Sequence, residues 1–137
     1  MKDWVKDIRD MQFKYGVHKW IHDNKDNNDS LKRYLEFRID FLKEELDETE
    51  SALISMDSEE IVDGLIDLCV VAIGTLDAFG VDPYKAWDEV LKANLNKTVG
   101  VKPERPNPLG LPDLIKPEGW EGPSHEGNHG KLNDIRS

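Results

Sequence analysis

The chain has 137 residues, of which 28 are acidic and 18 basic, so its formal net charge is −10. This length suits one domain, and the acidic balance argues against a nucleic acid or an anionic membrane surface as partner, because phosphates attract clustered Lys and Arg. The single cysteine, Cys69, excludes an intrachain disulfide framework and a Cys-rich zinc site. No apolar leader follows Met1, so we expect a cytoplasmic protein.

Apolar residues recur every three or four positions in the first part of the chain, which predicts helices. The first helix is expected over residues 2–15 and ends at Gly16; residues 22–30 are polar and predict a loop, with Ser30 as the cap of the next helix. The second helix is expected over residues 31–53, with one apolar stripe formed by Leu31, Leu35, Ile39, Leu42, Leu46 and Thr49.

The third and fourth helices are predicted over residues 58–79 and 83–96. Asp57, with Glu60 three residues later, is typical of a capping box at the start of the third helix. The centre of that helix is apolar nearly all round, which indicates a central helix or one buried at a subunit contact. The uncharged run between Asp67 and Asp77 is only nine residues long, well short of the roughly 20 that span a membrane. The sequence thus predicts an all-α, oligomeric bundle of four to five helices.

The character of the chain changes after Thr98. Residues 98–130 hold six of the seven prolines and six of the ten glycines. We therefore expect residues 1–97 to form one helical domain, and residues 98–137 to be a partly ordered C-terminal extension that is not a separate domain.

The excess negative charge is confined to a short segment. Ten acids and no Lys or Arg lie between residues 44 and 67, whereas the rest of the chain has 18 acids and 18 bases. These acids are Glu44, Glu45, Asp47, Glu48, Glu50, Asp57, Glu59, Glu60, Asp63 and Asp67.

Two pairs of acids on consecutive helices suggest a metal site. Glu45 and Glu48 are three residues apart and share a helix face, as do Glu60 and Asp63. A tight connector makes the helices antiparallel neighbours, so the two pairs can face each other. Hard oxygen ligands suit Mg²⁺, with Mn²⁺ as a substitute, and Mg²⁺ completes its shell with waters and substrate phosphates. The alternative, a solvated acidic surface, is equally compatible with the pattern alone.

The segment Glu44-Glu45-Leu46-Asp47-Glu48, followed by Glu60-Ile61-Val62-Asp63, resembles the EExxE…ExxD signature of the MazG-like nucleoside triphosphate pyrophosphohydrolases. These belong to an all-α superfamily that includes phosphoribosyl-ATP pyrophosphohydrolase and dimeric dUTPase. Arg38 before the motif, Asn94 and Lys97 in an N-x-x-K pattern, and residues 116–120, which resemble K-P-x-G-W, extend the similarity to residues 31–122. The eleven residues between Glu48 and Glu60 make this spacing short for the family. Gly64 and Val70 stand where alanine and tyrosine are common in the family.

The resemblance implies hydrolysis of ribo- or deoxyribonucleoside triphosphates between the α and β phosphates, giving a monophosphate and pyrophosphate. It implies Mg²⁺ held by Glu45, Glu48, Glu60 and Asp63, with Glu44 or Glu45 as general base. Asp67 then orients a ligand or a metal-bound water. The substrate-binding residues implied are Arg38, Asn94, Lys97, Lys116 and Trp120.

Two other functions remain open at this point. One is a non-catalytic acidic helical protein with an interaction or regulatory role. The other is a phosphoribosyl-ATP pyrophosphohydrolase, and the tail after Lys97 argues against that function. The apolar third helix and the resemblance both favour a homo-oligomer, a dimer or a tetramer. The expected partner is the nucleotide substrate, without nucleic acid or membrane.

Overall fold

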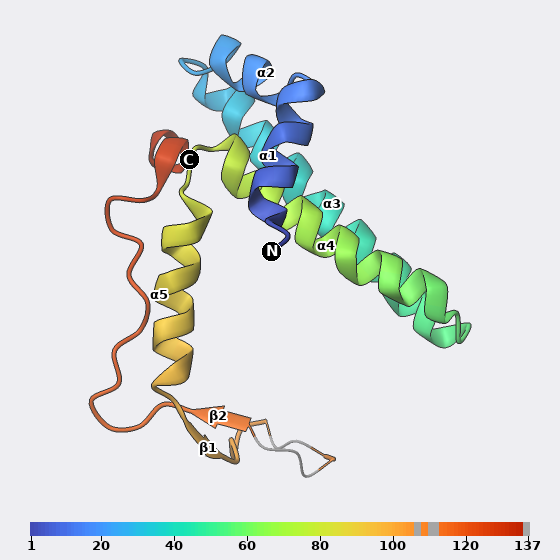
Figure 1. The fold of residues 1–137 in the computed structure, drawn as a ribbon, viewed down its shortest axis with the longest axis vertical. Coiled ribbons are helices and arrows are strands. Elements are labelled where there is room, and N and C mark those ends of the chain that lie inside the picture. The colour runs from blue at the N-terminus through green and yellow to red at the C-terminus, as the bar shows by residue number, and fades with distance from the viewer. Residues whose placement is uncertain (106–107, 110–112, 136–137) are drawn as a thin grey trace. The chain divides into compact units, whose positions relative to one another are not determined.

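The computed structural model describes residues 1–105, 108–109 and 113–135. Its helices confirm the all-α prediction (Figure 1). In chain order the elements are α1 (Trp4–Lys14), α2 (Val17–Asp23), α3 (Asn28–Ile54), α4 (Ser58–Ala78), α5 (Pro83–Leu95), β1 (Thr98–Gly100), β2 (Asp113–Ile115) and the 3₁₀ turn η1 (Gly130–Asp134).

The chain forms two compact units. The first holds Met1–Pro83 and the chain from His129 onward, and the second holds Tyr84–Asn128. The boundary between these units falls at the start of α5. The domain over residues 1–97 with a C-terminal extension stays a prediction. Residues 106–107, 110–112 and 136–137 of the predicted extension lie outside the described residues.

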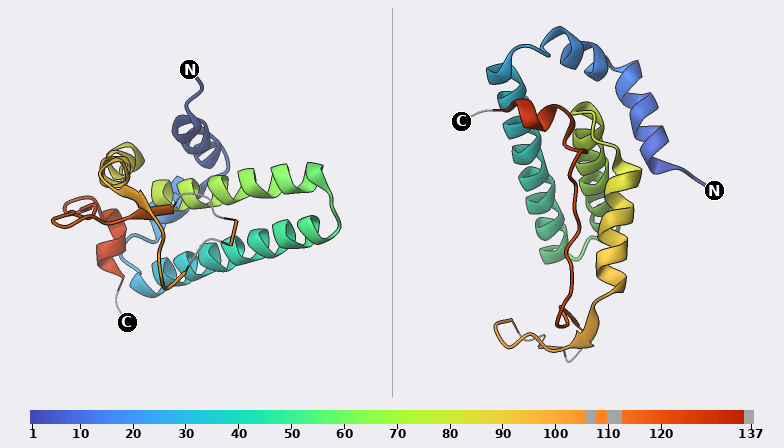
Figure 2. Two further views of the ribbon diagram at one scale, coloured as in Figure 1. Left: turned by 90° about the horizontal axis from the view of Figure 1, so that it is seen from below. Right: turned by 90° about the vertical axis from the view of Figure 1, so that its left-hand side faces the viewer.

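The first unit is built on an antiparallel hairpin of α3 and α4 (Figures 1 and 2). Asp57 caps α4 as predicted, because its side chain accepts a hydrogen bond from the Glu60 backbone N–H at 3.2 Å. The two helices approach closely at Gly64, where an added Cβ would overlap Thr49 Oγ1. The glycine that departs from the family pattern is thus the position that lets α3 and α4 come together.

The predicted apolar stripe on α3 is wrong at two positions. Ile39 is 43% exposed and Leu46 is 55% exposed. The side chains buried on α3 are instead Leu31, Glu45 and Ala52, which are 14 and seven residues apart and so lie on one face of the helix. The helix is therefore rotated so that a carboxylate lies in the seam where a leucine was expected.

Helix α2 and the start of α3 were not predicted. Residues 17–23 form a short helix that begins at Gly16, whose φ of 81° lies in the left-handed region that glycine favours. The prediction that Ser30 caps α3 is wrong: the cap is Asn27, whose Oδ1 accepts from the Ser30 backbone N–H at 3.1 Å. The polar loop is accordingly much shorter than expected.

The core of the first unit joins both ends of the chain. Ile21, Leu31, Ala78 and Phe79 are buried together, and Leu132 and Ile135 from the C-terminal segment pack against them. The Lys131 backbone N–H donates to the Phe79 carbonyl at 2.7 Å, which anchors η1 at the end of α4.

The second unit combines α5 with a two-stranded antiparallel ribbon, which the sequence did not predict. Thr98 pairs with Ile115 and Gly100 with Asp113. The Trp120 indole N–H donates to the Ala93 carbonyl at 2.8 Å, so the segment after the ribbon returns to α5.

No single helix in the described part of the chain is long and apolar enough to cross a membrane; α4 and α5 meet that length and composition test only when taken together.

Candidate active site

The centre of the acidic segment is a buried carboxylate. The Glu45 side chain lies in the α3–α4 seam and is 9% exposed. Burial raises its pKa above the ordinary carboxyl value, and the negative charges of Glu48, Asp67, Glu44 and Asp63 raise it further. Among the residues that the structure describes, no Lys or Arg forms an ion pair with it.

The hairpin register decides which acids surround Glu45. Thr49 lies against Gly64, and Arg38 contacts Thr75, so residue 45 is level with residue 68 and residue 60 with residue 53. Asp67 and Asp63 are therefore within electrostatic reach of Glu45, whereas Glu60 is two turns further along and is not among the charges that act on it.

The predicted ligand set is thus only partly brought together. Glu45, Glu48 and Asp63 lie in one electrostatic cluster with Glu44 and Asp67, whereas Glu60, the fourth predicted ligand, is not among the charges that act on Glu45. Because α3 and α4 are fully helical here, a shift of one or two turns in pairing changes which acids meet, and sequence spacing alone does not determine it.

The cluster suits Mg²⁺ by its donor chemistry. Its groups are hard oxygen donors with excess negative charge, and folding raises the pKa of the central one. Within the described ranges, no three His, Cys, Asp or Glu side chains are close enough to hold one ion by themselves. That arrangement fits an ion held by one or two carboxylates and completed by waters and substrate phosphates, which is the usual form of Mg²⁺ sites.

A pocket of about 310 Å³ adjoins the carboxylates. Glu45 and Asp67 line it together with residues from α1, α2, α3 and α4 of the first unit. The remaining lining residues are Met11, Gln12, Tyr15, Val17, Arg38, Phe41, Val70 and Val71. An apolar and aromatic wall with a few convergent polar groups is typical of a small-molecule site.

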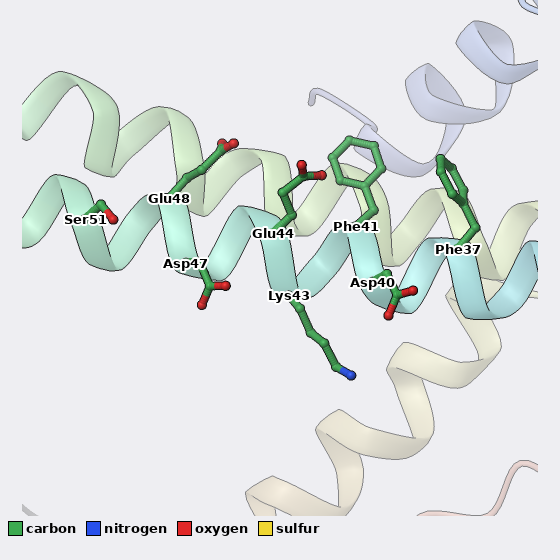
Figure 3. A pocket seen from close by; sticks show the side chains of 8 residues that line it. All are labelled: Phe37, Asp40, Phe41, Lys43, Glu44, Asp47, Glu48 and Ser51. Atoms are coloured by element: carbon green, nitrogen blue, oxygen red, sulfur yellow. The ribbon is translucent and has the colours of Figure 1, made fainter.

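A second, wider hollow of about 740 Å³ runs along α3. All of its lining residues belong to that helix, from Phe37 to Ser51. Figure 3 shows Glu44 and Glu48 along one edge of α3, while Asp47 and Lys43 point the opposite way. No residue of α4 lines this hollow, and it lacks Glu45, whereas Glu45 and Asp67 both line the smaller pocket, which is therefore the better candidate for the site.

Arg38 connects the two helices beside the pocket. Its Nε donates to Thr75 Oγ1 and its Nη2 to the Val71 carbonyl, both at 3.0 Å. Two of its N–H groups thus bind α4, and the guanidinium lies 5.8 Å from the centre of the Phe41 ring. Its cationic group is held in position by the fold, in keeping with its predicted place in the site.

The other predicted substrate-binding residues lie in the second unit. The Lys97 and Lys116 ammonium groups lie 5.3 Å and 5.1 Å from the centre of the Trp120 ring. The Lys97 backbone N–H donates to the Asn94 carbonyl at 3.2 Å, so Asn94 adjoins this cluster. The structure therefore brings together Lys97, Lys116 and Trp120, which the sequence separates by up to 23 positions.

Sequence reasoning missed a buried polar network on the other side of the pocket. The Asp77 carboxylate, 4% exposed, accepts hydrogen bonds from Arg9 Nε at 3.1 Å, Gln12 Nε2 at 2.7 Å and His18 Nε2 at 2.8 Å. It joins α1 and α2 to α4. A signal was present in the sequence, since Gln12 and Ile8 are one helical turn apart, but a lone glutamine among apolar residues does not indicate a buried partner.

The fold and the site define an all-α protein with an acidic centre between two antiparallel helices. The sequence model of the phosphoribosyl-ATP pyrophosphohydrolase family matches residues 15–94, more than half of the chain. The chain therefore belongs to this family, a branch of the all-α nucleotide pyrophosphohydrolase superfamily, and is a hydrolase that acts on the acid anhydride of a nucleotide. Comparison with curated proteins gives no match.

Proposed function

We propose that the chain is a MazG-like enzyme that hydrolyses nucleoside triphosphates between the α and β phosphates and releases pyrophosphate. The observation that carries this is the buried Glu45 carboxylate, surrounded by four further acids beside a pocket of nucleoside size. Such a concentration of negative charge is unfavourable unless cations neutralise it, and the bound cations can in turn bind an anionic phosphate.

The predicted ligands of Mg²⁺, or of Mn²⁺ as a substitute, are Glu45, Glu48, Glu60 and Asp63. In the arrangement described above, one or two of the nearer three, Glu45, Glu48 and Asp63, would hold an ion that waters and substrate phosphates complete, and Asp67 would orient a ligand or water. When bound, the ion neutralises charge on the phosphate oxygens. Glu45, or its neighbour Glu44, accepts a proton from the attacking water. A carboxylate whose pKa is raised suits this role, because a general base works best when its pKa approaches the working pH.

Arg38 of the first unit and Asn94, Lys97, Lys116 and Trp120 of the second remain predicted substrate-binding residues. Within the second unit, Lys97 and Lys116 bring two positive charges to the face of Trp120. Ammonium N–H groups are good donors to phosphate oxygens.

Phosphoribosyl-ATP is the second candidate substrate, and the family match over residues 15–94 favours it. The tail with Lys116 and Trp120 lies beyond the matched residues and resembles that of the compact triphosphatases. A panel of ribo- and deoxyribonucleoside triphosphates together with phosphoribosyl-ATP, read as pyrophosphate released with Mg²⁺, separates the two.

Glu48→Gln and Asp63→Asn are expected to reduce pyrophosphate release by about a hundredfold or more, as expected when a group that positions charge in such a site is lost. Folding is expected to persist, because both side chains are exposed. Circular dichroism checks the fold and a coupled phosphate assay the activity. Unchanged Mg²⁺-dependent release by either folded variant contradicts the proposal, and no release by the native chain on any substrate favours a non-catalytic interaction protein.

We also propose that the protein is a homo-oligomer that pairs through α4. Val62, Leu65 and Ile66 form an exposed apolar stripe on this helix. Such a stripe is costly in water, and the same stripe on a second copy matches it in length and chemistry. Light scattering at micromolar concentration is expected to give at least a dimer, and Leu65→Lys is expected to shift it toward the monomer; a native monomer overturns this.

A further inference from the structure

Arg38 carries a positive charge at the pocket beside the carboxylates. Among the described residues that line this pocket it is the one Lys or Arg, and Glu45 and Asp67 line the same pocket. Within the described ranges Arg38 nevertheless forms no ion pair with either carboxylate. An arginine that is kept from pairing with acids at the same pocket retains its charge for an anionic ligand.

Thr75 on α4 completes a closed set of three hydrogen bonds with Arg38. Arg38 Nε donates to Thr75 Oγ1 at 3.0 Å, and Arg38 Nη2 donates to the Val71 carbonyl at 3.0 Å. The Thr75 hydroxyl donates to the same Val71 carbonyl at 2.7 Å. Because a guanidinium only donates and a carbonyl only accepts, the direction of each bond is fixed.

The two bonds from Arg38 to α4 fix the orientation of its guanidinium. A single hydrogen bond lets the group turn about that bond, and a second bond from a neighbouring nitrogen removes this freedom. Arg38 Nη1 has no hydrogen-bond partner among the residues that the structure describes, and it is not one of the buried atoms without a partner, so it is open to solvent. Nη1 is therefore the nitrogen available to a ligand.

We propose that Thr75 is a positioning residue, which holds the Arg38 guanidinium so that Nη1 can donate to the phosphates of the substrate. Thr75 is not among the residues that line the pocket, so it acts through Arg38. The inference rests on the proposed function and deepens it. A guanidinium that is oriented before the ligand arrives loses less side-chain freedom on binding phosphate than a mobile one does.

The hydroxyl of Thr75 is itself held by its own helix. In a helix, a threonine side chain takes the rotamer in which Oγ1 can bond to the carbonyl one turn earlier, and here that carbonyl belongs to Val71. Valine has the shape of threonine without the hydroxyl, and serine has the hydroxyl without the methyl group. Thr75→Val and Thr75→Ser thus separate the hydrogen bond from the packing.

The test measures the binding of inorganic tripolyphosphate with Mg²⁺ by calorimetry, because this probe carries the phosphate chain without a base. Arg38→Met is expected to weaken binding by about tenfold or more, as when a hydrogen bond to a charged group is lost. Thr75→Val is expected to weaken it by about fivefold, and Thr75→Ser to stay within about twofold of the native chain. Circular dichroism checks that each variant folds.

The double variant tests whether Thr75 acts through Arg38. Adding Thr75→Val to Arg38→Met is expected to change binding by less than about twofold, because the group that Thr75 holds is already gone. Arg38→Lys keeps the charge but lacks the two fixed bonds, and it takes the place of Arg38→Met if that variant does not fold. A further fivefold loss in the double variant overturns the inference.

Ser55→Ala is the matched control. Its hydroxyl also donates to the carbonyl four residues earlier, that of Ser51 at 3.0 Å, and it lies at the end of α3, outside the pocket. It is expected to bind the probe as the native chain does. If Thr75→Val has a lower Tm but native binding, its hydroxyl only stabilises the fold and the inference is overturned.

Pyrophosphate release from the nucleoside triphosphates, measured in parallel, separates this inference from the proposed function. In Thr75→Val the KM is expected to rise about as much as the Kd of the probe, with kcat changed by less than about twofold. Native KM and Kd in Thr75→Val, with hydrolysis intact, leave the proposed function standing and overturn the role of Thr75. The expected binding changes without any hydrolysis support that role and contradict the enzyme. If the native chain does not bind the probe, the inference is overturned.

Discussion

Replacing Glu45 by glutamine is expected to abolish pyrophosphate release and, in the absence of Mg²⁺, to stabilise the fold at neutral pH. The carboxylate is buried among four other acids, so folding disfavours its charged form. Glutamine keeps the shape and removes the charge. As with other general bases, loss of the group is expected to reduce the rate by about 10²–10⁴-fold.

The gain in stability from Glu45→Gln is expected to depend on pH, and its direction follows from the pKa shift. Because the folded-state pKa of Glu45 is raised, the folded chain binds this proton more tightly than the unfolded chain does. The resulting penalty is absent below the ordinary carboxyl pKa and grows as the pH rises through the folded-state value. The gain in Tm of Glu45→Gln is therefore expected at pH 7 and should vanish near pH 3. Added Mg²⁺ should raise the Tm of the native chain at pH 7 and not that of the variant.

Glu50→Gln is the matched control. It makes the same substitution on the same helix at an exposed position, and Glu50 is not among the charges that act on Glu45. It is expected to leave the Tm, its pH dependence and the activity close to native. If the Tm of Glu45→Gln does not rise at pH 7, the claim that the acidic cluster carries unneutralised charge in the metal-free protein is wrong. If this variant keeps native activity, Glu45 is not the general base.

The long helices could be predicted from sequence because their signals are local. The period of apolar residues indicated α3 and α4, and the Asp57 cap and Pro83 marked boundaries that the structure has. Helix α2 was missed because its seven residues are mostly polar and too few to show a period. Its stability comes from Ile21 in the core, which is a tertiary contact.

The faces of the helices could not be predicted in the same way. Apolar patterning assumes that buried positions are apolar, but Glu45 on α3 and Gln12 on α1 are buried and polar. Gln12 is tolerated for a reason that lies on another helix, since Gly74 and Asp77 accept its amide hydrogens. The pairing of Asp67, not Glu60, with Glu45 depends likewise on the close approach at Gly64. The acids could be identified from sequence; the arrangement of the site depends on long-range contacts.

Replacing Asp77 by alanine is expected to have the largest effect on stability, about 3–5 kcal/mol lost from the free energy of unfolding, as when one partner of a buried ionic network is removed. Asp77 accepts hydrogen bonds from side chains on both α1 and α2. Its loss leaves the buried Gln12 amide N–H with one acceptor fewer. Urea denaturation followed by circular dichroism measures the change.

The effect is expected to be concentrated in α1 and α2, because the α3–α4 hairpin has its own contacts at Gly64 and Arg38. Hydrogen exchange should therefore rise first in residues 4–23 of Asp77→Ala and much less in α4. Asp10→Ala is the control: its carboxylate pairs only with Lys6 at the surface of α1, and such pairs contribute about 0.2–1 kcal/mol. If the two variants lose similar stability, Asp77 does not hold the first two helices, and the rigid placement of Gln12 in the pocket has no support.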